Sequence, residues 1–323
     1  MAEFDLIEII KQLTRQNRPD VRIGIGDDAA VVCVPPDCEL VICSDTLVSG
    51  VHFPVNTDPA DIGWKSLAVN LSDLAAMGAT PAWATLAMTL PVADSGFVER
   101  FAKGFAELAA AWEVDLVGGD TTRGPLSITV TAHGFVPAGQ AIQRSGATVG
   151  DAVYVTGTLG DAAAGLRILQ SASALGAESG AHERFVVTRL NRPQARIGAG
   201  TALRELASAC IDISDGLLAD LGHVASSSAV GIEIGEDCLP QSTALAECFD
   251  AETRTGLQMW GGDDYELAFT IAEANVEVMR EAMERQGCRV SRIGRVIDEP
   301  GVHVLDHNGR RRPTTSKGWD HFK

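Results

Sequence analysis

Aspartates set beside glycines recur along the whole chain, in four short segments that lie far apart in the sequence. The segments are Gly24–Asp28, Gly118–Thr122, Ile211–Gly216 and Gly261–Tyr265. Neighbouring carboxylates repel one another, and glycine alone is sufficient to make a tight turn. Hard cations, by contrast, bind several carboxylate oxygens on a backbone that allows close approach. The pattern therefore predicts a site for several Mg²⁺ ions, and Mg²⁺ is commonly bound together with phosphate groups.

Asp45 is a further candidate ligand, because it follows an apolar strand-like segment and lies between the hydroxyls of Ser44 and Thr46. Hydroxyl and carboxylate oxygens are hard ligands that suit Mg²⁺. The alternative is an aspartate that only caps a turn.

A buried helix with one polar stripe is predicted from Pro59 to about Met77. Asp58 is its expected N-cap and Gly78 its expected C-cap. Its sides are apolar except for three polar residues at helical spacing, which are Ser66, Asn70 and Asp73. A buried polar stripe must face polar groups, so Asp73 is a candidate metal ligand. The alternative for Asp73 is an N-cap to a neighbouring helix or a buried polar pair, and the role of Asn70 stays open between ligand and support.

Asp120 follows a strand predicted over 114–117, at a turn predicted over 118–120, where α/β sheets often bind ligands. Asp212 and Ser214 share one face of a second predicted strand. Asp215 begins a predicted helix, and a plain N-cap role would also explain it. All three aspartates are candidate metal ligands, with a simple turn as the alternative for Asp120.

Several common sites are excluded by their missing residues. Gly24–Ala29 matches a dinucleotide fingerprint, but two carboxylates would face the pyrophosphate and a strand-like segment follows in place of a helix. The sequence contains no P-loop, no His-Glu-x-x-His and no Gly-x-Ser-x-Gly, and Ile211–Gly216 lacks the later ligands of an EF-hand.

The alternatives stay open for three other residues: His52 and Trp319 are either substrate contacts or packing residues, and Arg144 is either a phosphate clamp or a surface arginine.

Composition limits the class of protein. The 323 residues, 46% hydrophobic and 21% charged, indicate a folded chain of about two domains. A net charge of −17 argues against a nucleic-acid partner. Seven cysteines without a Cys-x-x-Cys pair, no leader-like start and no long apolar run indicate a reduced, cytoplasmic protein without membrane insertion.

Helical and strand-like segments alternate loosely in both halves, which predicts two α/β or α+β domains, 1–140 and 141–323. In the first half we expect helices at 4–15, 59–77 and 96–112 and strands at 31–32, 40–42, 114–117 and 127–136. In the second half we expect helices at 161–170, 193–207, 215–226 and 274–286 and strands at 210–213 and 266–271.

Six motifs together resemble the bacterial thiamine-monophosphate kinases, within the aminoimidazole ribonucleotide synthetase-like ATP-binding enzymes. They are Gly24–Ala29, Ser44–Phe53, Asn70–Ala79, Gly118–Gly124, Ile213–Leu217 and Gly261–Leu267. The resemblance runs in order through nearly the whole chain to the terminal Trp-Asp-His-Phe. It departs from the family pattern at Cys43, where Thr or Ser is expected, and at Asp263, where Glu is frequent.

The resemblance implies an N-terminal domain that binds ATP and Mg²⁺ and pairs its sheet with a second subunit in a homodimer, and a C-terminal α/β domain. The metal ligands it implies are Asp28, Ser44, Asp45, Asp73, Asp120, Asp212 and Asp215. The ATP contacts it implies are Gly119, Asp120, Arg144 and Ser214, and the substrate contacts are His52, Asp263 and Trp319.

The activity implied by the resemblance is transfer of the ATP γ-phosphoryl group to thiamine monophosphate, giving thiamine diphosphate in the last step of its biosynthesis. A phosphate monoester with a second pKa of about 6 is mostly dianionic at neutral pH, so no side-chain base or nucleophile is expected. Mg²⁺ ions would offset the repulsion between the two polyanions during direct in-line transfer. The alternatives are a related synthetase that closes a ring on a ribonucleotide amide, and a non-enzymatic acidic metal-buffering protein.

Overall fold

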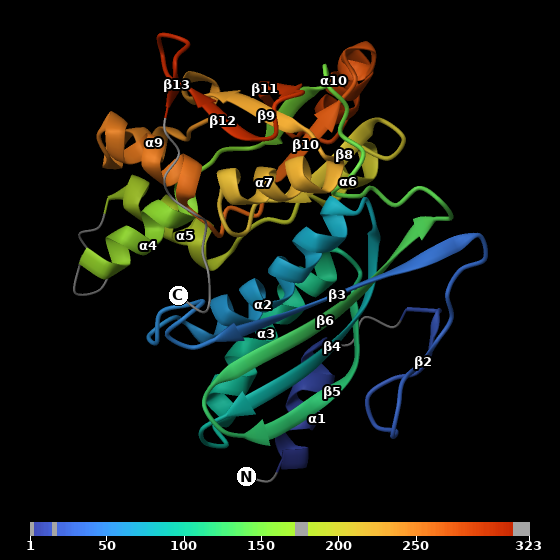
Figure 1. Cartoon of the computed structure of the whole chain (residues 1–323). Helices are drawn as coiled ribbons and strands as arrows, with labels where there is room; N and C mark the ends of the chain where they lie inside the picture. Colours follow the sequence, from blue (N-terminus) through green and yellow to red (C-terminus); the bar gives the residue numbers. More distant parts are fainter. Residues whose placement is uncertain (1–2, 15–17, 172–179, 313–323) are drawn as a thin grey trace. The chain divides into compact units, whose positions relative to one another are not determined.

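The computed structural model describes residues 3–14, 18–171 and 180–312, and its contacts divide the chain into two compact units. Unit 1 comprises Met1–Leu74 and Ala79–Gly139, and unit 2 comprises Ala75–Gly78 and Gln140–Lys323. Each unit has its own β-sheet and its own helices (Figure 1). This mixed α/β organisation confirms the predicted fold class.

Unit 1 is built on a four-stranded sheet with the strand order β3-β6-β4-β5. The strands are β3 (Cys38–Val48), β4 (Thr80–Leu90), β5 (Asp115–Arg123) and β6 (Ser127–Pro137). β6 pairs antiparallel with both β3 and β4, whereas β4 and β5 are parallel. Parallel neighbours need a long crossover, which a helix between β4 and β5 provides. The predicted turn at residues 118–120 is wrong, because β5 continues through it in register with β4.

Three helices belong to unit 1: α1 (Glu3–Thr14), α2 (Pro59–Ala76) and α3 (Ser95–Ala111). They agree with the helices expected from the sequence. At the start of α2, the Asp58 carboxylate accepts a hydrogen bond from the Ala60 N–H at 2.8 Å, and Gly78 beyond its end has φ +69°. Both local signals that predicted this helix are therefore present.

The helices α2 and α3 touch through their backbones at two glycines. A Cβ atom on Gly63 would lie 2.0 Å from the Phe101 carbonyl oxygen, and one on Gly104 would lie 1.8 Å from the Ala60 carbonyl oxygen. Any side chain at either position would separate the helices. This contact fixes the position of α2, which carries two of the candidate site residues.

A small hairpin made of β1 (Val21–Ile23) and β2 (Val31–Val32) packs on an apolar cluster around Trp83. The Trp83 ring meets the Phe135 ring edge-on, with centroids 4.9 Å apart. The indole N–H of Trp83 donates to Asp20 at 3.2 Å, just before the hairpin. The hairpin carries the first Asp-Gly segment in the loop between its strands.

Unit 2 is built on a seven-stranded sheet with the strand order β13-β12-β9-β11-β7-β10-β8, in which only β9 and β12 run parallel. The strands are β7 (Ala152–Thr156), β8 (Ala207–Asp212), β9 (Gly231–Gly235), β10 (Leu267–Ile271), β11 (Val290–Ile297), β12 (Gly301–Leu305) and β13 (Arg311–Arg312). Helix α7 (Leu217–Ser228) contacts β8, β9 and β12. The main core of the unit lies between this helix and the sheet.

The other helices of unit 2 are α4 (Asp161–Ser171), α5 (Ala181–Asn191), α6 (Ile197–Ala202), α8 (Thr243–Cys248), α9 (Ala251–Trp260) and α10 (Val276–Arg285), with short 3₁₀ turns η1 (Glu236–Cys238) and η2 (Glu273–Asn275). The helices α5, α8 and α9 were not expected from the sequence, and the helix expected at 193–207 is shorter, as α6. That helix is short because Glu205 takes φ +61° and Ala207 already pairs with Ile271 in the sheet. Among the described residues, none of the helices is long and apolar enough to cross a membrane.

Candidate active site

Asp45 is held against α2 by Asn70. The backbone N–H of Asp45 donates to Asn70 Oδ1 at 3.1 Å, and Asn70 Nδ2 donates to the Ser66 carbonyl at 3.1 Å. The thiol of Cys43 lies 3.3 Å from the Asn70 carbonyl oxygen. Asn70 is fully buried, so β3 provides the polar surroundings that the stripe on α2 requires. Asn70 supports the backbone that carries Asp45, and half-buried Asp73 follows it by nearly one turn on α2.

Ser44 lies on the opposite face of the sheet from Asp45, because side chains alternate along a strand. The Ser44 hydroxyl bonds with the hydroxyl of Thr131 at 2.9 Å, and Thr46 bonds in the same way with Thr129 at 2.8 Å. Within unit 1, the two neighbouring candidate ligands therefore do not face one ion together.

Gly119 and Asp120 lie on the edge strand β5, and only glycine fits at position 119. A Cβ atom on Gly119 would lie 1.8 Å from the Leu86 carbonyl oxygen, and its φ is +153°. Asp120 is exposed and in register with Ala87 of β4. The exposed carboxylate and the bare backbone beside it are accessible to a ligand.

Asp45 and Asp120 belong to the two opposite edges of the sheet, with β6 and β4 between them. At about 4.8 Å per strand, they are separated by roughly 14 Å, too far for both to bind one ion. Within the described ranges, no three His, Cys, Asp or Glu side chains come close enough together to hold a metal ion.

Asp28 and His52 occupy loops of unit 1. Asp28 is exposed between β1 and β2, and its N–H donates to Asp27 Oδ1 at 2.8 Å. His52 folds back onto the end of β3, where the Val48 N–H donates to its Nδ1 at 2.9 Å. The neutral ring therefore carries its proton on Nε2, which makes that nitrogen a donor.

The acidic loop of unit 2 follows β8 and is held by an aspartate that the sequence reading missed. Asp212 is the last residue of β8 and is buried. The N–H groups of Ser214 and Asp215 both donate to Asp220 Oδ2 at 3.1 Å. Burial, together with the charges of Asp212 and Asp215, raises the pKa of Asp220 to about 8. Helix α7 is capped by Gly216, so the N-cap interpretation of Asp215 is wrong.

The segment Gly261–Tyr265 lies directly beside this acidic loop. The Asp263 N–H donates to the Ser214 carbonyl and the Tyr265 N–H to the Ile213 carbonyl, both at 2.9 Å. Two Asp-Gly segments that are about 50 residues apart in the sequence thus meet at one end of the β8-β10 pair. Unit 2 brings together Asp212, Ser214, Asp215 and Asp263, four of the residues expected at the site.

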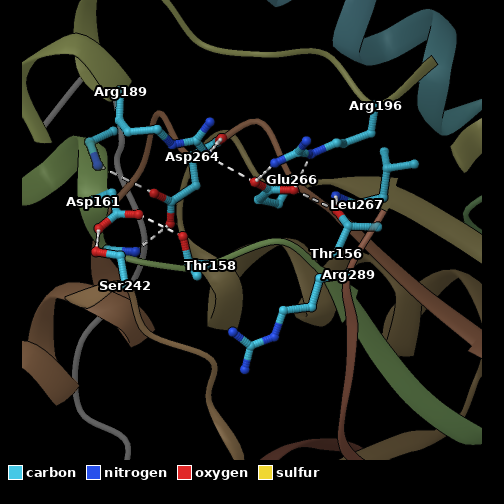
Figure 2. A network of polar contacts seen from close by, with 12 residues as sticks. Thr156, Thr158, Asp161, Arg189, Arg196, Ser242, Asp264, Glu266, Leu267 and Arg289 are labelled. Carbon is cyan, nitrogen blue, oxygen red and sulfur yellow. Dashed lines mark hydrogen bonds and ion pairs between the residues drawn. The ribbon is translucent and has the colours of Figure 1, made fainter. Parts of the chain in front are cut away.

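A network of buried charges fixes the start of β10 (Figure 2). The fully buried Glu266 carboxylate accepts hydrogen bonds from Arg196, Arg189 and Thr156. Figure 2 shows the two arginines reaching this carboxylate from two sides. Asp264 accepts from the Gly160 N–H at 2.7 Å, at the N-terminus of α4. Asp264 is therefore part of the support of the loop.

The same network continues to Asp161 in the first turn of α4. Its carboxylate accepts hydrogen bonds from the hydroxyls of Thr158 at 2.6 Å and Ser242 at 2.5 Å. Burial raises the pKa of Asp264 to about 8, although the Gly160 N–H and the charge of Arg189 oppose the change. The turn before α4, the start of β10 and the segment before α8 are consequently joined by side-chain contacts.

Two remaining candidates are less informative. Arg144 is exposed next to β8, where the Cys210 N–H donates to the neighbouring Gln143 carbonyl at 2.9 Å. Trp319 lies outside the described residues. Their expected roles as ATP and substrate contacts stay predictions.

The residues that sequence reasoning missed are Asp220, Tyr265 and Glu266, together with Arg189 and Arg196. A lone Asp220 among the apolar residues of α7 is a signal that could have been used, since a carboxylate on a buried helix face needs partners. The arginines gave no local signal, because their partner is about 70 residues away in the sequence.

Comparison with known proteins identifies the family of the chain. Residues 26–136 match the model of the AIR synthase related protein, N-terminal domain, and residues 148–307 match that of the C-terminal domain. A thiamine-monophosphate kinase of Salmonella typhimurium is 46% identical over 322 residues, which cover 99% of this chain and 98% of that relative.

The chain belongs to the thiamine-monophosphate kinase family.

Two solved structures of this family are similar to the chain over its full length. The thiamine-monophosphate kinase of Stenotrophomonas maltophilia has 48% identity and a TM-score of 0.89, and covers 97% of this chain and 98% of its own. A structure described as AaThiL complexed with AMPPCP and TMP has 34% identity and a TM-score of 0.78, and covers 99% of this chain and 97% of its own. The resemblance found in the sequence motifs is thus confirmed, as membership of the thiamine-monophosphate kinase family.

Proposed function

We propose that this chain transfers the γ-phosphoryl group of ATP to thiamine monophosphate and so forms thiamine diphosphate. The observation that carries the proposal is full-length similarity to thiamine-monophosphate kinases, one of which is described as a complex with AMPPCP and TMP. The Asp-Gly segments support it, since they supply carboxylates beside accessible backbone.

The donor types suit Mg²⁺, because carboxylate and hydroxyl oxygens are the hard ligands that this ion prefers. The residues that would hold the ions are Asp28, Ser44, Asp45, Asp73, Asp120, Asp212 and Asp215. When bound, Mg²⁺ would offset the charge between the attacking and leaving oxygens.

The chain's own residues would act by positioning. Gly119 and Asp120 offer a bare backbone and a carboxylate at the edge of β5, and with Ser214 and Arg144 they would contact ATP. His52 would donate from Nε2 to the acceptor phosphate, because its Nδ1 is already an acceptor. Asp263 and Trp319 would contact the rest of thiamine monophosphate. An acceptor that is already dianionic needs no side-chain base, so an in-line transfer is consistent with these roles.

We further propose that the protein acts as a homodimer in the cytoplasm. The edge strand β3 exposes Leu40 and Ile42, at 38% and 58%, and an exposed apolar edge strand favours pairing with another chain. Asp45 and Asp120 lie far apart on one four-stranded sheet. A second copy would allow Asp45 of one subunit to lie near Asp120 of the other. The seven cysteines are free thiols, which suits a reducing compartment.

ADP release measured with ATP and Mg²⁺, with and without thiamine monophosphate, tests the activity. We expect ADP release only when thiamine monophosphate is present, together with an equal amount of thiamine diphosphate. ADP release with a ribonucleotide amide in its place would favour the ring-closing alternative. No release with any acceptor, despite Mg²⁺ binding, would favour the metal-buffering alternative.

A further inference from the structure

The turn that precedes β10 holds two residues in an uncommon backbone conformation. Asp263 has φ +68° and Tyr265 has φ +50°, both in the left-handed region that favours glycine. Two such residues on either side of Asp264 are kept only where the surroundings determine the backbone. The segment Asp263–Tyr265 is therefore held in one backbone conformation.

The surroundings hold this turn from two directions. On one side, the backbone N–H groups of Asp263 and Tyr265 donate to the acidic loop after β8. On the other side, the Asp264 carboxylate accepts a hydrogen bond from the Gly160 N–H, and Glu266, the residue after Tyr265, is fixed by Arg196 (Figure 2). The backbone at Asp263 is thus fixed before any ligand binds.

The side chain of Asp263 is fixed as well, by the residue two positions later. The Tyr265 hydroxyl donates a hydrogen bond to Asp263 Oδ1 at 3.0 Å. Tyr265 is buried, whereas Asp263 is half-buried and reachable from solvent. A buried phenol that holds a half-exposed carboxylate keeps that carboxylate in one orientation towards solvent.

We propose that Tyr265 is a positioning residue for the acceptor, which orients the Asp263 carboxylate towards the cationic ring system of thiamine monophosphate. The inference rests on the proposed function, in which Asp263 contacts this substrate. An aspartate has a short side chain with little reach, so its direction decides whether it meets the positive charge. Tyr265 acts through Asp263 and contributes to acceptor binding, not to the transfer step.

Steady-state kinetics of Tyr265→Phe test this role, because the substitution removes only the hydroxyl. We expect the KM for thiamine monophosphate to rise roughly tenfold, the effect of losing one hydrogen bond to a charged group. The KM for ATP and kcat should stay within about twofold of the parent, since uniform binding of one substrate is lost. Tyr154→Phe is the matched control: Tyr154 is buried in β7 and stacks on Phe269 away from the turn.

The double variant Asp263→Asn with Tyr265→Phe separates this role from a merely structural one. If Tyr265 acts through the Asp263 carboxylate, the double variant should have the same KM for the acceptor as Asp263→Asn alone. The inference would be overturned if the two substitutions raised the acceptor KM by independent factors that multiply in the double variant. It would also be overturned if Tyr265→Phe left the acceptor KM unchanged, or raised the KM values for ATP and for the acceptor equally.

The parent protein distinguishes this failure from failure of the proposed function. If the parent releases no ADP with thiamine monophosphate, the proposed function is wrong and the inference falls with it. If the parent is active and only the behaviour of the Tyr265 variants differs from expectation, the inference alone is wrong.

Discussion

Replacing Glu266 by glutamine is the most direct test of the buried network in unit 2. The Glu266 side chain is fully buried, and its two oxygens accept four hydrogen bonds, from Arg196 Nη2 and Arg189 Nη2 on one oxygen and from Arg196 Nε and Thr156 Oγ1 on the other. In Glu266→Gln the amide NH₂ faces at least one guanidinium N–H, whichever way it is turned.

The expected loss of stability follows from the lost hydrogen bonds and from the lost charge of the buried ion pair. Each hydrogen bond to a charged group contributes about 1.5–3 kcal/mol, and removing one partner of a buried ion pair costs about 3–5 kcal/mol because the other charge is left uncompensated. We therefore expect Glu266→Gln to lower the free energy of unfolding of unit 2 by about 3–5 kcal/mol. A loss of this size is a large part of the stability of an ordinary domain.

The assay is urea unfolding followed by circular dichroism, with hydrogen exchange of peptides from β7 and β10 to assign the transition to unit 2. Glu273→Gln is the matched control, since the pair Arg292–Glu273 has side chains 45% and 53% exposed and should contribute less than about 1 kcal/mol. If Glu266→Gln destabilises the protein no more than Glu273→Gln, the network does not stabilise the start of β10 and the reasoning is refuted.

Three other predictions concern the candidate site and its supports. Asp45→Asn and Asp73→Asn should each lower kcat by about 100-fold or more at unchanged circular dichroism, because each removes a proposed metal ligand, and near-normal turnover in both would contradict the metal site. Gly119→Ala should destabilise unit 1 by more than about 1 kcal/mol in urea unfolding, because its methyl group would meet the backbone of β4 1.8 Å away. Asp264→Asn should remove a pH dependence: the pKa of Asp264 is raised from 3.8 to about 8, so the folded chain keeps a proton that the unfolded chain has lost. The free energy of unfolding of the parent should then fall, relative to the variant, by up to about 1.4 kcal/mol per pH unit between pH 4 and 8, and a constant difference in urea unfolding at pH 5 and pH 7 would contradict this.

Local signals in the sequence were sufficient for the elements whose ends they mark. Asp58 and Gly78 predicted α2 correctly, since caps and end glycines act within a few residues. The glycine pair at 118–119 looks like a turn in the sequence, but both residues lie within β5. Position 119 requires glycine because the neighbouring backbone of β4 leaves no room for a side chain. Glu205 ended a helix early by a backbone conformation that its residue type does not indicate.

The types of the proposed ligands are visible in the sequence, but their arrangement in space is not. The residue types that suit Mg²⁺ are visible in the sequence, and the alternation of side chains separates Ser44 from Asp45 only once β3 is known to be a strand at both positions. The meeting of Asp215 with Asp263 depends on the pairing of β8 and β10, which is a contact between distant segments. Tyr265 had no signal, because its role is defined by a single hydrogen bond across a left-handed turn.

The close approach of α2 and α3 at Gly63 and Gly104 has a consequence for engineering this protein. Since the two helices meet through main-chain atoms, no rearrangement of neighbouring side chains can make room for even a methyl group at either glycine. A mutational library aimed at substrate range therefore has to leave this helix crossing unchanged, so that Asn70 and Asp73 keep their positions.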